Sequence, residues 1–205
     1  MVFGTLVEDR ELTQKLVEAV LEKEHAKIEE LFNSENKPNV DAEFNGMPLI
    51  IYAAQKKDWQ TVNILYDNFA NLDAKIELSN WHLIHECVLN APDNVFNALI
   101  QYCDLNVRDR YGKTPLMVLI EEGKLDRAEK LLKQGISVAI TDKNNENAGH
   151  YAARKNAYDI LLSLGEKKLP FNQLNKSNES VLDLIEDLSF KENLPKMIGK
   201  LIKEE

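Results

Sequence analysis

The fold of this chain is decided by one short stretch, Asp109-Arg110-Tyr111-Gly112-Lys113-Thr114-Pro115-Leu116. Gly112 predicts a tight turn, because glycine adopts positive φ at little steric cost. Thr114 is suited to cap a helix, and Pro115 fits the first helical position, where its missing N–H is not needed. The stretch therefore predicts a turn that leads directly into a helix.

Two helices are predicted after this turn. The first is apolar from Leu116 through Ile120 and ends near Gly123. The second has an apolar stripe at helical spacing, formed by Leu125, Ala128, Leu131 and Leu132. Gly135 is expected to stop the second helix, because glycine is common just past a helix C-terminus. Turn, helix, short turn and helix make one complete unit.

The unit recurs along the chain at a nearly constant period. A Gly or Asn stands at intervals of 34, 32, 33 and 33 residues, at Gly46, Asn80, Gly112, Asn145 and Asn178. A short acidic or amide residue stands three positions before each of them, at Glu43, Glu77, Asp109, Asp142 and Asn175. A period of this length predicts stacked units that bury their apolar faces only against their neighbours.

These units resemble the ankyrin repeat, whose signature is Asp-x-x-Gly-x-Thr-Pro-Leu-His-x-Ala-Ala. Thr-Pro-Leu is complete only at residues 114–116. Elsewhere the signature survives in paired alanines and single histidines at the right offsets, namely Ala53-Ala54, Ala152-Ala153, His85 and His150. The resemblance covers about residues 13–205 and implies an all-α ankyrin-repeat solenoid with short turn or hairpin tips and capping helices at both ends.

The resemblance implies a single ankyrin-repeat domain over residues 1–205. Residues 12–44 are expected to form an N-terminal capping helix pair, because they have the apolar spacing without the turn motif. Four central repeats are expected over 45–177, the last with a short second helix ending at Gly165. Residues 178–205 are expected to form a polar C-terminal capping repeat, with Asp183 at the family's histidine position.

The net charge of −9 is unevenly placed. Residues 1–44 have 5 basic and 11 acidic side chains, residues 178–205 have 4 and 7, and residues 45–177 have 16 of each. A chain with acidic ends and a neutral body lacks the basic footprint of a nucleic-acid-binding protein. The ends are interpreted as solvated caps, with an acidic docking patch as the alternative. A monomer that binds a protein is expected.

Two observations indicate a cytoplasmic location without a membrane partner. Cys87 and Cys103 are too few for a disulfide framework, which favours a reducing compartment. The first residues lack the basic start and apolar stretch of a secretory signal, and no apolar run approaches the roughly 20 residues of a membrane span. Delivery into a host cell by a signal-peptide-independent secretion system is compatible with the same pattern.

The histidines invite a metal hypothesis, especially His82 and His85 with Cys87 nearby. Zinc needs three or four converging ligands, and a fourth is not evident. The resemblance implies instead that His85 and His150 hydrogen-bond turn backbone. The chain also has no nucleophile elbow, phosphate-binding glycine loop or kinase signature. No catalytic, cofactor-binding or metal-binding residue is predicted.

A partner-binding surface is predicted from the resemblance, because ankyrin partners usually meet the turn tips and the concave ends of the inner helices. Carried over by register, this surface comprises Phe44, Met47, Lys56, Trp81, Arg110, Tyr111, Lys113, Lys143, Asn144 and Arg154. Its aromatic and apolar members stand where a solvated tip would prefer polar residues, and exposed aromatics near Arg are typical of interface hot spots. The alternative is that some of them, Trp81 above all, fold inward to seal an imperfect turn.

The function favoured by these patterns is a non-enzymatic protein–protein interaction module. The 20 Asn, and the 20 Lys against 5 Arg, are typical of AT-rich genomes. Small degenerate ankyrin proteins similar to this one occur in intracellular bacteria, where some act as effectors injected into host cells. The alternatives are an immunity or inhibitor protein that plugs a cognate toxin, a scaffold subunit of an enzyme complex, or an enzyme of unrecognised type.

Overall fold

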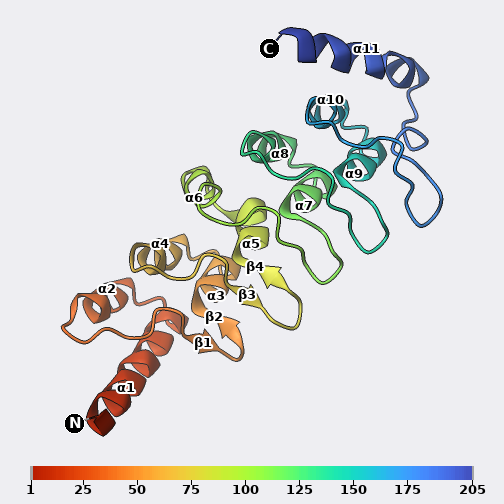
Figure 1. The fold of residues 1–205 in the computed structure, drawn as a ribbon. Coiled ribbons are helices and arrows are strands. Elements are labelled where there is room, and N and C mark those ends of the chain that lie inside the picture. The colour runs from red at the N-terminus through yellow and green to blue at the C-terminus, as the bar shows by residue number, and fades with distance from the viewer. Residues whose placement is uncertain (1, 205) are drawn as a thin grey trace. The chain divides into compact units, whose positions relative to one another are not determined.

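The structure is a computed structural model that describes residues 2–204, with side chains described for residues 9–199. Helices joined by turns follow one another along the chain (Figure 1). The contacts divide the chain into two compact units, residues 1–103 and residues 104–205, called unit 1 and unit 2 below. No helix within residues 2–204 combines the length and the apolar character needed to cross a membrane.

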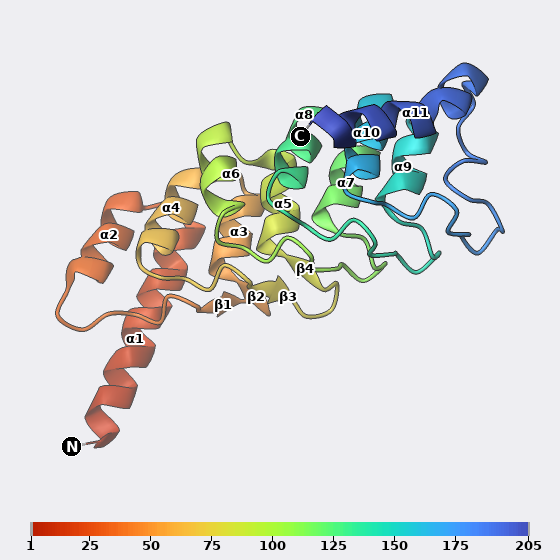
Figure 2. The same cartoon turned by 45° about the horizontal axis from the view of Figure 1, so that its top comes forward.

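Unit 1 is built from helix pairs separated by short hairpins (Figure 2). Its elements are α1 (Val2–Leu21), α2 (His25–Asn33), β1 (Glu43–Phe44), β2 (Met47–Pro48), α3 (Leu49–Gln55), α4 (Trp59–Asp67), β3 (Lys75–Ile76), β4 (Trp81–His82), α5 (Leu83–Asn90) and α6 (Asp93–Leu99). Inner helices α1, α3 and α5 pack in sequence, and α2, α4 and α6 pack outside them. Leu16, Ile28, Leu49 and Leu65 are fully buried between the two layers.

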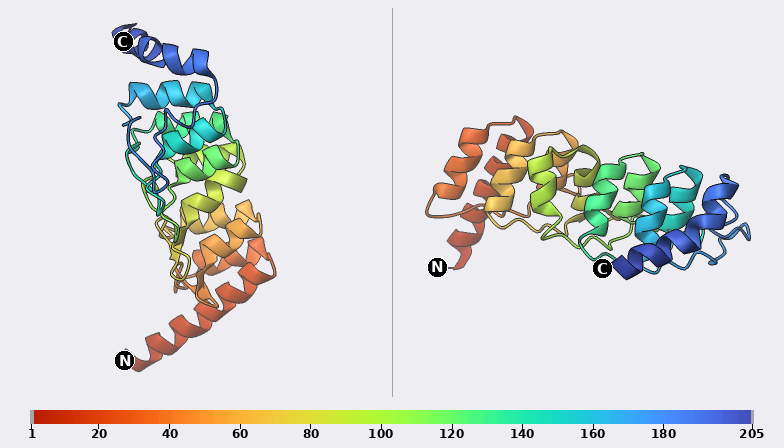
Figure 3. Two further views of the ribbon diagram at one scale, coloured as in Figure 1. Left: turned by 90° about the vertical axis from the view of Figure 1, so that its right-hand side faces the viewer. Right: turned by 90° about the horizontal axis from the view of Figure 1, so that it is seen from above.

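Unit 2 repeats this two-layer arrangement, and no strand separates its helix pairs within residues 104–204. Its elements are α7 (Pro115–Glu121), α8 (Leu125–Leu132), α9 (Ala148–Arg154), α10 (Tyr158–Glu166) and α11 (Leu188–Glu204). Helix α7 packs against α8 and α9, and α10 packs against α8, α9 and α11 (Figure 3). Both units are mainly helical, and the strands within residues 2–204 are only two residues long. The predicted all-α stacking of helix pairs is confirmed within each unit.

The periodic Gly and Asn residues mark the turns, as their conformational freedom predicts. All five have positive φ: 73° at Gly46, 49° at Asn80, 84° at Gly112, 62° at Asn145 and 60° at Asn178. The predicted helix start is also confirmed, because the Thr114 hydroxyl accepts the N–H of Met117 at 3.3 Å and Pro115 is the first residue of α7. The 33-residue period therefore marks the turn positions at which the backbone adopts the left-handed conformation, with positive φ.

The expectation that Gly165 ends the second helix of its unit is wrong. Gly165 lies inside α10, which continues to Glu166, and Lys168 takes the left-handed conformation at φ 61°. A Cβ at Gly165 would collide with the side chain of Ile198 in α11. Gly165 therefore allows two helices to approach closely, a role that local sequence does not reveal.

The last segment is less regular than the sequence pattern indicates. Residues 181–184 form a single turn rather than an assigned helix, and α11 follows it. The Asp183 carboxylate accepts the backbone N–H of Ser180 at 2.9 Å, and the Ser180 hydroxyl accepts the N–H of Asp183 at 3.2 Å. The residue at the family's histidine position thus closes a capping box around one turn.

Candidate protein-interaction surface

The turns of unit 2 are closed by a carboxylate or amide side chain. Oδ1 of Asp109 accepts the backbone N–H groups of Tyr111 and Lys113, both at 2.8 Å. Asp142 and Asn175 make the corresponding pairs of bonds at distances of 2.8–2.9 Å. Asp and Asn have the right length to reach the backbone two residues ahead, which explains why the period places them three positions before the turn residue.

The two turns of unit 1 have Glu at this position and close differently. Strands β1 and β2 pair antiparallel, with Phe44 opposite Met47. Asn45 and Gly46 lie between them at φ 52° and 73°, the conformation that a two-residue hairpin loop requires. Strands β3 and β4 pair with Ile76 opposite Trp81. The longer Glu43 side chain is exposed, and backbone pairing supplies the closure instead.

Neighbouring tips of unit 2 are joined through their backbones. The N–H of Lys143 donates to the carbonyl of Tyr111 at 2.8 Å, and the N–H of Lys176 donates to the carbonyl of Asn144 at 2.9 Å. The turns before α7 and α9 run side by side in Figure 2. Side chains from successive tips are therefore held on one continuous surface.

Four of the predicted partner-binding residues lie exposed on these tips: Arg110, Tyr111, Lys143 and Asn144. We call them the unit 2 tip surface. The guanidinium carbon of Arg110 lies 4.7 Å from the centre of the Tyr111 ring, which is 52% exposed. Asp109, Asp142 and Glu146 are buried beneath the tips. The exposed charges of the tip surface are therefore basic. Lys176 is exposed on the next tip and is not among the partner-binding residues predicted from the sequence.

Lys113 and Arg154 do not add free charge to this surface. Nζ of half-buried Lys113 lies 2.7 Å from the Glu121 carboxylate. Both Nη atoms of Arg154 donate to Glu146, which is only 7% exposed. Burial raises the pKa of Glu146, but hydrogen bonds from Arg154 and Asn175 outweigh it and hold this pKa below its ordinary value. Both side chains remain part of the predicted surface, and each is paired with a carboxylate of its own repeat.

The predicted residues of unit 1 form two small aromatic clusters. The half-buried Phe44 ring meets the edge of Tyr52 at a centroid distance of 5.7 Å, and Nζ of exposed Lys56 lies 5.5 Å from the centre of the Tyr52 ring. Met47 is half-buried opposite Phe44. Trp81 is also half-buried, and its ring stacks on His85 at 4.9 Å. Trp81 therefore both packs inward and keeps part of its ring accessible.

The histidines stand at helix starts. Nδ1 of His85 accepts the backbone N–H of His82 at 3.2 Å, and Nδ1 of His150 accepts that of Asn147 at 3.1 Å. Burial lowers the pKa of fully buried His150, although Glu146 opposes the shift. Across the described part of the chain, no three His, Cys, Asp or Glu side chains are grouped so as to hold a metal ion. Cys103 is buried near the Leu72 carbonyl.

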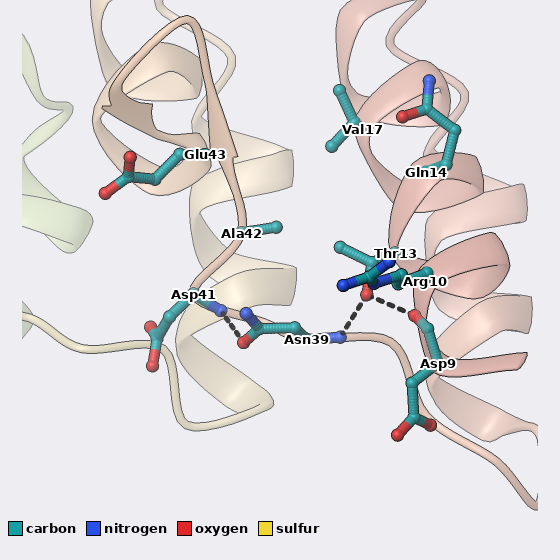
Figure 4. A pocket seen from close by; sticks show the side chains of 9 residues that line it. All are labelled: Asp9, Arg10, Thr13, Gln14, Val17, Asn39, Asp41, Ala42 and Glu43. Carbon is teal, nitrogen blue, oxygen red and sulfur yellow. Dashed lines mark hydrogen bonds between the residues drawn. The ribbon is translucent and has the colours of Figure 1, made fainter. Parts of the chain in front are cut away.

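An acidic hollow that sequence reasoning missed lies between α1 and residues 39–43 (Figure 4). Its volume is about 570 Å³, and its charged lining residues are Asp9, Arg10, Asp41 and Glu43. Thr13 connects its two walls, donating to the Asp9 carbonyl at 2.7 Å and accepting the N–H of Asn39 at 3.1 Å. The hollow is assembled by segments that lie about 30 residues apart in the sequence, so no local pattern predicts it.

Comparison with known proteins agrees with the repeat geometry. A family model described as ankyrin repeats in three copies matches residues 84–175. Residues 84–175, slightly less than half of this chain, are therefore similar to ankyrin repeats. Over 122 residues, 58% of this chain, it is 35% identical to inversin of Mus musculus and 34% identical to inversin of Homo sapiens. Over 73 residues, it is 37% identical to inversin of Danio rerio.

The similarity to inversin is confined to a small part of that protein. The matched region covers 11% of the mouse and human proteins and 7% of the zebrafish protein. The chain therefore spans about a tenth of the length of these curated relatives. The family model that matches residues 84–175 describes ankyrin repeats, which generally mediate protein–protein interaction rather than catalysis.

Proposed function

We propose that the chain is a non-enzymatic protein-binding module whose unit 2 tip surface contacts an acidic face of its partner. The observation that carries this proposal is the pair of backbone hydrogen bonds that joins successive tips, from Lys143 to Tyr111 and from Lys176 to Asn144. These bonds fix an exposed aromatic ring among exposed cations. Such a surface favours a partner of opposite charge and supplies an aromatic anchor.

The predicted residues of unit 1 provide a second, less charged contact region in this proposal. Phe44, Met47 and Trp81 are half-buried, so binding would bury the remainder of each side chain without first ordering it. Lys56 at the end of α3 is exposed. In unit 2, Arg154 takes part as a paired group at the end of α9 rather than as a free cation.

The test is the double variant Arg110→Ala and Tyr111→Ala. Its affinity for a partner captured with the wild-type chain should fall by about 2 kcal/mol or more, measured by calorimetry. Its thermal unfolding midpoint should barely change, because both side chains lie outside the core. The matched control is Lys133→Ala with Gln134→Ala, two exposed residues after α8. If the double variant binds as tightly as the wild type and the control loses affinity, the unit 2 tip surface is not the binding surface.

We also propose that the protein works in a reducing cytoplasm, either of its own cell or of a host cell reached as an effector without a signal peptide. Cys87 and Cys103 are both buried as thiols, which supports a reducing compartment. A translocation reporter fused to the chain tests host delivery directly. The identity of the captured partner distinguishes the roles. A host protein would support an effector, and a toxin would support an inhibitor. Several subunits of one enzyme would support a scaffold.

A further inference from the structure

Two aromatic residues of unit 1 stand where unit 2 has none. A position shortly after the outer helices α4, α6, α8 and α10 recurs at a period of 33 and is occupied by Phe69, Tyr102, Gly135 and Lys168. Gly135 and Lys168 have φ of 73° and 61°, as expected where the chain leaves a helix. Unit 1 places Phe69 and Tyr102 there instead.

Phe69 is unfavourable at this position for two separate reasons. Its φ is 67°, a conformation that bulky residues rarely adopt. The residue is also 91% exposed, so it contributes almost nothing to the hydrophobic core. Neither backbone conformation nor packing explains a phenylalanine here. Strained backbone that persists without a packing benefit is more common at functional positions.

Phe69 follows a tyrosine whose ring lies close to a second exposed tyrosine ring. Its backbone N–H donates to the Tyr66 carbonyl at 2.9 Å, which places it one turn beyond Tyr66 at the end of α4. The Tyr66 ring in turn lies 6.1 Å from the ring of Tyr102, which is 63% exposed and follows α6. We call Tyr66, Phe69 and Tyr102 the aromatic corner.

The unit that contains the aromatic corner is net acidic. Unit 1 has 8 basic and 17 acidic residues and so holds a net charge of −9, whereas unit 2 has 17 of each. Helices α4 and α6 contain no Lys or Arg, and the only basic residue over residues 58–103 is Lys75, which lies 3.3 Å from Glu77. Asp67 is exposed beside Tyr66. A cation approaching the corner therefore meets aromatic faces and negative charge together.

We propose that the aromatic corner is a further docking surface, separate from the predicted partner-binding residues, for a basic segment of a partner protein whose Arg or Lys side chain stacks on Phe69 or Tyr102. Aromatic faces attract cations, and the net negative charge of unit 1 steers a basic segment toward them. The corner lies on the outer-helix side of unit 1 and shares no residue with the unit 2 tip surface. A like-charged surface of a second unit 1 is repelled from it.

The experiment selects short random peptides, displayed on phage, for binding to this chain. Selected sequences that bind the corner should be rich in Arg and Lys and poor in Asp and Glu. One selected peptide is then titrated by fluorescence anisotropy against the wild-type chain and Phe69→Gly. The Kd should rise about tenfold in the variant, as expected when a desolvated cation–π contact is lost.

Two controls keep the result interpretable. Phe69→Gly should unfold at no lower denaturant concentration than the wild type, because glycine adopts this φ freely. Tyr111→Ala, which removes the exposed ring of the unit 2 tip surface, should leave the peptide's Kd unchanged. The proposal is overturned if selection yields no Arg- or Lys-rich peptide that depends on Phe69. It is also overturned if sedimentation detects a dimer that Phe69→Gly abolishes, since the occupant is then a second copy of this chain.

Discussion

Glu146 and Arg154 form an ion pair in which both Nη atoms of the arginine donate to the carboxylate. One repeat earlier, Lys113 and Glu121 form the same contact with the charges exchanged. Each residue is 33 positions from its equivalent, and both pairs span eight residues from the tip to the end of an inner helix. The repeat geometry thus brings these two positions together whichever of them is basic.

Replacing Arg154 with alanine should lower the free energy of unfolding by about 1–3 kcal/mol near neutral pH. The substitution leaves the Glu146 carboxylate, only 7% exposed, without its charged donor. Urea denaturation measures the change. Lys155→Ala removes the next exposed cation and should have little effect. If both variants lose the same free energy of unfolding, Arg154 acts only through the net charge of the protein and not through its contact with Glu146.

The same pair predicts a pH dependence. The pKa of Glu146 in the folded protein is below its ordinary value of 4.5, because the Arg154 and Asn175 hydrogen bonds outweigh burial. The ionised carboxylate therefore stabilises the fold above about pH 4.5 and loses this effect as pH falls through the lowered pKa. The stability difference between wild type and Arg154→Ala should shrink between neutral pH and about pH 3. A difference independent of pH would contradict this linkage.

The two kinds of turn should respond differently to loss of their acidic residue. Asp109→Ala removes the acceptor of two backbone N–H groups and should cost about 1–3 kcal/mol. Glu43→Ala removes an exposed side chain from a hairpin closed by backbone pairing and should change stability by about 0.5 kcal/mol or less. Chemical denaturation of both variants provides the comparison. Similar costs would mean that the carboxylate closes both turns.

The turns and helix pairs were predictable because they depend on local properties. Gly and Asn adopt positive φ at the least cost, and the apolar stripe of Leu125, Ala128 and Leu132 follows helical spacing. The state of the charged site residues was not predictable in this way. Lys113 and Arg154 are neutralised by partners eight residues away, a separation set by the path of turn and helix together. The exposure of Phe69 likewise depends on what packs beside the end of α4.

Buried His150 should make the protein less stable in mild acid. Burial holds its folded pKa below the ordinary value of 6.5, so the unfolded chain binds more protons once pH falls below about 6.5. Stability should therefore decline as pH falls from 6.5 toward the lowered pKa. The stability of His150→Gln should fall less steeply over this pH range. The variant should also be less stable by about 1–3 kcal/mol at neutral pH, because the contact of Nδ1 with Asn147 is lost. Parallel stability–pH curves for the two proteins would contradict the prediction.

Gly149 in α9 occupies the position of Leu116 in α7, and side chains from elsewhere in unit 2 fill the space that a leucine would take. A Cβ added to Gly149 would lie 3.0 Å from Cγ2 of Val181 and closer still to Leu169. Leu169 and Val181 are 5% and 0% exposed, so neither side chain can move into solvent. Gly149→Ala should therefore destabilise the protein by about 1–2 kcal/mol, although alanine favours a helix over glycine by about 1 kcal/mol.

A matched glycine separates overpacking from helix propensity. Gly199 lies inside α11, and among the described residues no side chain comes within 4 Å of the place that a Cβ would take, so Gly199→Ala should raise stability by up to about 1 kcal/mol. Combining Gly149→Ala with Leu169→Ala should cost less than the sum of the single changes, because the smaller side chain makes room for the added methyl group. Thermal and urea denaturation of the four variants measure these differences. A gain in stability from Gly149→Ala, matching that of Gly199→Ala, would show that Leu169 and Val181 do not fill the space above α9.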